Sequence, residues 1–144
     1  MPKSTTSFES FVSPDELRAV ILAVEKYPEF LPEVKRVEVK ERSDSALLAT
    51  FFVELKVSGV EVKTEYTVRY ALGRDVISWT LVSSPTLTKN EGQWRLEETA
   101  DGETKAFYEA ELITSLPIAP ELQKLIADQE LPKMMQRFRD RAEK

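Results

Sequence analysis

The chain has 144 residues, of which 42% are hydrophobic and 31% are charged, as expected for a globular protein long enough to bury a core. The absence of Cys and His excludes disulfides, thiol enzymes, zinc sites and catalytic triads that use an imidazole. A formal net charge of −5 argues against binding to the phosphate backbone of a nucleic acid.

The N-terminal stretch MPKSTTSFESF lacks the apolar core of a signal peptide, and no apolar run approaches the roughly 18 residues that cross a bilayer. We therefore expect a cytoplasmic protein with no stable membrane insertion. Residues 4–12 show no strong pattern but are compatible with a short edge strand.

A helix is predicted to begin after Ser13. Ser13 is a preferred N-cap residue, Pro14 suits the first helical position, and Glu16 completes a capping box. An apolar stripe follows at spacings of three and four residues, formed by Leu17, Val20, Ile21 and Val24. The pattern predicts a helix that continues to Lys26.

Two prolines mark the end of this helix. Because a residue that precedes proline is disfavoured in the α conformation, Pro28 and Pro32 should bracket a short, stiff turn. This turn has apolar side chains to bury, namely Tyr27, Phe30 and Leu31.

Apolar and polar residues alternate from Val34 onward, which predicts β-strands. Turn signals such as Ser58-Gly59 and Asp101-Gly102 separate them. Several of the strands exceed the usual five or six residues, which favours a strongly curved antiparallel meander. The predicted strands cover residues 34–40, 46–57, 60–70, 76–82, 86–98 and 104–114.

The chain is predicted to be helical from Pro120 to its end. Two apolar clusters in this helix point nearly opposite ways at 100° per residue. Pro132 lies between them and should bend the helix. The clusters are Leu122, Leu125 and Ile126, and Leu131, Met134, Met135, Phe138 and Ala142.

These elements predict one α+β domain over residues 1–144. Its curved antiparallel sheet of about seven strands should wrap on the long C-terminal helix.

Four segments resemble the START-like (SRPBCC) polyketide cyclase/dehydrase and coenzyme-Q-binding (lipid transport) family. They are YPEFLP at residues 27–32, ISWTLVSSP at 77–85, EGQWRLEE at 91–98 and LPKMMQRFRDRAE at 131–143. The resemblance extends from about Phe8 to Ala142. It implies the helix-grip fold of that family, with two short helices after the first strand and with a cavity between the sheet and the C-terminal helix that encloses a hydrophobic small molecule.

Strand parity and helix spacing predict which side chains face this cavity. Trp79 and Trp94 are either aromatic walls for a ligand or ordinary core. The hydroxyls of Tyr66 and Tyr108 should orient a ligand, whereas that of Tyr70 could reach solvent at a strand end. The predicted ligand-binding residues are Phe51, Val53, Tyr66, Trp79, Trp94, Tyr108, Met134, Met135 and Phe138.

The remaining charged residues have simpler explanations. Glu109 and Glu111 alternate with apolar residues and should lie on a solvated face, although an inward carboxylate could act as a base. The basic residues of the C-terminal segment should lie near the negative end of the helix dipole, where positive charge is stabilising.

Three functions therefore stay open. The leading one is non-catalytic binding of a lipid, quinone or polyketide-like molecule, because the chain offers no grouping of nucleophile, base and orienting residue. The first alternative is a polyketide aromatase/cyclase. The second is a protein- or ribosome-interaction module, as in one branch of the family. The protein is expected to be a monomer or homodimer, with no cofactor, no metal site and no nucleic-acid partner.

Overall fold

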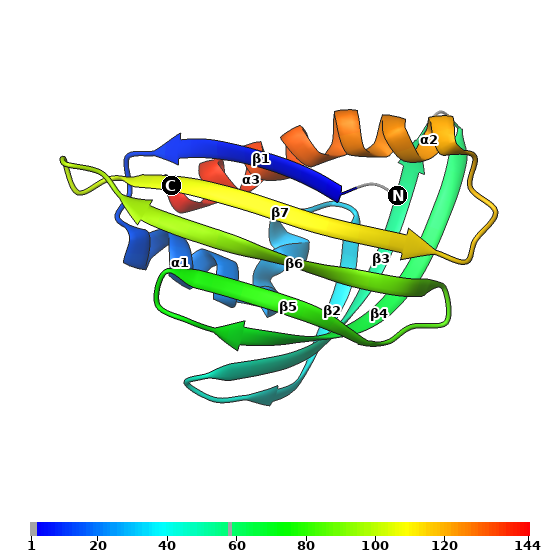
Figure 1. Ribbon diagram of the computed structural model, residues 1–144, viewed down its shortest axis with the longest axis horizontal. Helices are drawn as coiled ribbons and strands as arrows, with labels where there is room; N and C mark the ends of the chain where they lie inside the picture. The colour runs from blue at the N-terminus through cyan, green and yellow to red at the C-terminus, as the bar shows by residue number, and fades with distance from the viewer. Residues whose placement is uncertain (1–2, 58) are drawn as a thin grey trace.

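The computed structural model describes residues 3–57 and 59–144, and its seven strands form one antiparallel sheet in the order β1-β7-β6-β5-β4-β3-β2. Figure 1 shows how strongly this sheet curves. The strands are β1 (Lys3–Ser10), β2 (Val34–Arg42), β3 (Ala46–Val57), β4 (Val60–Leu72), β5 (Val76–Ser83), β6 (Leu87–Glu98) and β7 (Thr104–Thr114). The predicted seven-stranded antiparallel meander, with β1 at an edge, is confirmed. The predicted turn at Ser58-Gly59 lies partly outside the described residues, since only Gly59, with φ of 79°, is described.

Helix α1 (Pro14–Leu22) begins as predicted but ends early. The Ser13 hydroxyl accepts a hydrogen bond from the Glu16 backbone N–H at 3.2 Å. The predicted continuation to Lys26 is wrong, because the chain tightens into the 3₁₀ helix η1 (Val24–Glu29). Three residues per turn place Val24 and Tyr27 on the same buried side of η1. The Tyr27 hydroxyl then donates to the carbonyl of Ile21, which the end of α1 leaves open.

The C-terminal helical segment is interrupted next to Pro132, as expected, but by a π-helical turn. It consists of α2 (Pro120–Leu125), the π helix η2 (Ile126–Glu130) and α3 (Leu131–Ala142). Pro132 lies in the first turn of α3, where a backbone N–H is not needed. The π turn directly before α3 is where the helical hydrogen-bond pattern changes. Whether the axis also bends there stays a prediction.

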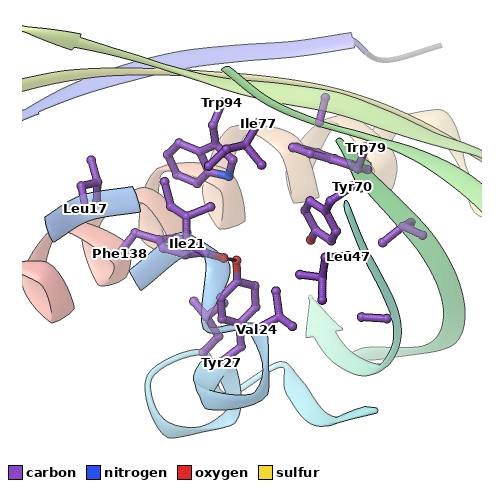
Figure 2. Close-up of a cluster of buried hydrophobic side chains, with 14 of the residues drawn as sticks. Leu17, Ile21, Val24, Tyr27, Leu47, Tyr70, Ile77, Trp79, Trp94 and Phe138 are labelled. Atoms are coloured by element: carbon purple, nitrogen blue, oxygen red, sulfur yellow. Dashed lines mark hydrogen bonds between the residues drawn. The ribbon is translucent and has the colours of Figure 1, made fainter. Parts of the chain in front are cut away.

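The core lies between the concave face of the sheet and the helices (Figure 2). Leu17 and Ile21 of α1 and Phe138 of α3 meet Ile77 and Trp94 of the sheet, and all five are at most 3% exposed. The two predicted clusters of the C-terminal segment differ: Met135 and Phe138 are buried, whereas α2 has no fully buried side chain. Among the described residues, no helix is both long and apolar enough to span a membrane.

We predict that Phe138→Ala destabilises the protein strongly. The Phe138 ring lies 5.2 Å from the Tyr27 ring and 5.1 Å from the Trp94 ring, centroid to centroid, so its removal leaves a hole where α3 meets the sheet. The free energy of unfolding should fall by about 3–5 kcal/mol in urea titrations. Lys133→Ala, on the exposed side of the same helix, should change it by less than about 0.5 kcal/mol. Equal losses of unfolding free energy in both variants would show that Phe138 does not contribute to the core.

Candidate functional site

A cavity of about 340 Å³ lies between the concave face of the sheet and the C-terminal helical segment. Its walls come from strands β3 to β7, from the junction of η1 with β2, and from the segment after β7. Most of its lining is aliphatic or aromatic. The aliphatic part includes Leu31, Val34, Val53, Leu55, Val62, Val68, Leu87, Ala110, Leu112, Leu116, Ile118, Leu131 and Met134.

Seven aromatic side chains of the lining form a closed circuit in which each ring contacts the next. Five belong to the sheet, one to η1 and one to α3. Neighbouring centroids are 4.9 to 6.5 Å apart, the usual separation of interacting aromatic pairs. In order around the circuit they are Tyr27, Phe51, Tyr70, Trp79, Tyr108, Trp94 and Phe138. The ring of Tyr66, which also lines the cavity, stacks on the ring of Phe51 with their centroids 5.4 Å apart.

Cross-strand register explains the position of the Trp79 ring. Trp79 of β5 pairs with Gly92 of β6, and Trp94 pairs with Tyr108 of β7. A Cβ atom at Gly92 would lie 2.8 Å from Cζ2 of Trp79 and would overlap the Glu109 carbonyl of β7. Because Gly92 has no side chain, it leaves room for the Trp79 indole along the cavity wall.

A small number of polar groups interrupt this apolar lining. The Trp79 indole Nε1–H donates to Oδ1 of Asn90 at 3.0 Å, and Asn90 is 5% exposed. The Tyr27 hydroxyl is already bonded to Ile21, so only the ring of Tyr27 is available to a ligand. In the described part of the chain, the hydroxyls of Tyr70 and Tyr108 make no hydrogen bond.

Burial keeps these phenols protonated. It raises the pKa of Tyr66 to about 12, with a smaller increase from the Glu33 carboxylate and a partial offset from the Asn90 amide. Burial also raises the pKa of Tyr108 and holds that of Tyr70 well above its ordinary value. At neutral pH the cavity thus contains hydrogen-bond donors rather than phenolate bases.

The charged groups of the lining are two carboxylates, each in an ion pair. Glu33 lies 3.4 Å from Arg137 of α3, and Glu130 lies 3.2 Å from Lys133. Among the residues that the structure describes, no Lys or Arg lines the cavity.

Eight of the nine predicted site residues line this cavity, and whether they hold a ligand stays a prediction. The prediction that Met135 lines the cavity is wrong, because Met135 is 4% exposed and packs in the core. Its side chain is turned by 100° around the helix from that of Met134, which does line the cavity. The solvent-reaching interpretation of Tyr70 is also wrong, since Tyr70 is 7% exposed. Glu109 and Glu111 face outward as predicted and pair with Lys3 and Lys89.

Asn90 and Glu33 were missed by sequence reasoning. Asn90 has the same strand parity as Gly92 and Trp94, so that alternation contained the signal for an inward side chain. Glu33 lies in the irregular segment between η1 and β2, where no periodicity indicates a direction.

A family model described as "Polyketide cyclase / dehydrase and lipid transport" matches residues 12–139 of this chain. No curated protein matches the sequence significantly.

Several solved structures share the fold. The Zhui aromatase/cyclase from Streptomyces sp. R1128 superposes with a TM-score of 0.82 at 16% identity, over 99% of this chain and 93% of that one. A START superfamily protein from Mycobacterium smegmatis gives 0.80 at 17% identity, over 98% and 97%. A STAR-related lipid transfer protein from Xanthomonas axonopodis gives 0.78 at 14% identity, over 97% and 85%.

We predict that no tyrosine of the folded protein ionises near pH 10. All four tyrosines of the chain line the cavity, and burial raises the pKa of each. The unfolded chain loses these protons at an ordinary pKa of about 10, so the folded state binds more protons above that pH. Stability from these groups is therefore complete below about pH 10 and is lost as the pH rises further.

An alkaline titration followed by near-UV phenolate absorbance and far-UV circular dichroism tests this. Phenolate absorbance should appear only as the circular dichroism of the folded state disappears. In concentrated guanidinium all four tyrosines should titrate together near the ordinary value. A phenolate signal near pH 10 in the folded protein would show that a hydroxyl is open to water.

Proposed function

We propose that this chain, which belongs to the polyketide cyclase/dehydrase and lipid transport family, binds a hydrophobic small molecule in the cavity and does not transform it. The observation that carries the proposal is the closed aromatic circuit around an apolar cavity of about 340 Å³. This volume is at the small end of the range for ligand sites, roughly 300–1,000 Å³. It suits a compact molecule of a few fused rings or a short acyl chain better than a long lipid.

Polyketide cyclisation is the second candidate. A structural relative at 16% identity is named an aromatase/cyclase, and the hydroxyls of Tyr66, Tyr70 and Tyr108 could hydrogen-bond the carbonyls of a polyketide chain. Cyclisation also needs a base that removes a proton next to a carbonyl. The chain has no His, its buried phenols stay protonated, and the lining carboxylates of Glu33 and Glu130 are engaged in ion pairs. The cavity is therefore better suited to binding than to acid–base turnover.

We predict that filling the cavity abolishes ligand binding without unfolding the protein. Val53 of β3 faces the cavity and Glu54, the next residue, faces solvent. Val53→Trp should eliminate the binding heat of a quinone or an aromatic ketone in titration calorimetry, while Glu54→Trp keeps it. Thermal melts of both variants establish that they are folded. Unchanged binding in Val53→Trp would place the ligand elsewhere.

Two further results separate the functional classes. Incubation with a linear polyketide analogue should return the analogue unchanged, and a ring-closed product identified by mass spectrometry would establish the cyclase. Native mass spectrometry of protein from its own host should reveal a small molecule that accompanies it. If no ligand class binds and a macromolecule co-purifies instead, the interaction-module hypothesis replaces the proposal.

A further inference from the structure

The two edge strands of the sheet differ in how well they are protected from pairing with another strand. Strand β2 has charged residues at six of its nine positions, and its register with β3 shifts twice. Charges and bulges of this kind hinder the pairing of an edge strand with another chain. In β1, by contrast, residues 4–8 are uncharged and pair with β7 in an unbroken register. Figure 1 shows β1 at the border of the sheet, beyond β7.

The backbone of β1 has hydrogen-bonding groups to offer to a further strand. Every second residue of an edge strand directs its N–H and C=O away from the sheet. In the part of the chain that the structure describes, the backbone of residues 4–8 hydrogen-bonds only to β7. Helix α3 reaches the C-terminal end of β1, where the Ser10 hydroxyl donates to Glu143 at 2.7 Å. The open part of this edge is therefore the stretch that precedes Ser10.

The sequence of β1 is complementary to itself when two copies run antiparallel. In a continuous sheet, residues opposite each other lie on the same face, so the possible registers differ by two residues. With a twofold axis at Thr6, Lys3 of one chain lies opposite Glu9 of the partner subunit. Lys3 and Glu9 are the charged residues of β1, and both are exposed. Moving the axis by one residue in either direction separates them, so opposite charges select this register.

We propose that two copies of this chain associate through antiparallel pairing of their β1 strands, about a twofold axis at Thr6, and so form one continuous sheet. Such a contact uses the same surface on both chains, as is usual in homodimers. The register also places Phe8 of the partner subunit opposite Ser4, which lines the cavity. Phe8 faces the concave side, since its ring packs edge-on against that of Trp94. The dimer thus adds an aromatic side chain to the border of each cavity.

Sedimentation velocity of the full chain over a range of concentrations tests the proposal. A species with twice the 16.5 kDa mass of one chain should appear as the concentration rises. Pairing of a single short strand makes a smaller interface than those of tight complexes, so we expect the dimer at micromolar rather than nanomolar concentrations.

Charge reversal and mixing assign the dimer to β1. Lys3→Glu and Glu9→Lys each place like charges opposite one another at two positions, so each variant alone should dimerise about tenfold more weakly or worse. An equimolar mixture of the two variants should recover the dimer, because every Glu then faces a Lys of the other chain. Both changes also affect contacts with β7, where Lys3 lies 3.2 Å from Glu109 and Glu9 is opposite Lys105. Recovery on mixing cannot arise from those contacts, since they lie within one chain.

Lys40→Glu is the matched control, because it reverses an exposed charge on the opposite edge strand, β2, and should leave dimerisation unchanged. Thermal melts establish that all variants are folded. A chain that stays monomeric at every concentration overturns the proposal. So does a dimer that Lys40→Glu weakens as much as Lys3→Glu does, or one that the mixture of variants fails to recover.

Discussion

The cavity depends on the contact of each aromatic ring with its two neighbours in the circuit. These side chains are rigid, so a ring that rests against the next one cannot fold into the space beside it. The circuit closes only because Tyr27 of η1 and Phe138 of α3 join rings from the sheet. The docking of the C-terminal helix and the open space beneath it are thus consequences of the same contacts.

The strands were the most predictable part of the molecule because one face of each is buried. A side-chain period of two then appears directly in the sequence, and β3 and β7 have the predicted bounds, Ala46–Val57 and Thr104–Thr114. The same parity predicted that Phe51, Tyr66 and Trp79 would share the concave face. Parity and helix spacing placed eight of the nine predicted residues on the cavity, whose existence the family resemblance implied.

Features that depend on a contact between different elements could not be predicted in this way. At the early end of α1 the Ile21 carbonyl accepts a hydrogen bond from the Tyr27 hydroxyl, a contact that exists only once η1 has formed. The role of Asn90 depends on the register between β5 and β6, which brings the Trp79 indole within reach. The assignment of Met135 failed for a related reason: a helix touches the cavity along a narrow stripe, and a rotation of 100° moves a side chain into the core.

The residues that hold the fold together differ from those that distinguish ligands. Phe138 and its neighbours stabilise the molecule through buried area, for which shape and volume matter more than chemical identity. A different apolar set can meet the same requirement, and for this reason likeness of fold to cyclases and lipid-transfer proteins leaves the ligand open. Recognition requires a donor at a defined place and in a defined direction. In this chain the Trp79 indole supplies one such constraint, because its single N–H fixes Oδ1 of Asn90 as the acceptor and so sets the orientation of the Asn90 amide.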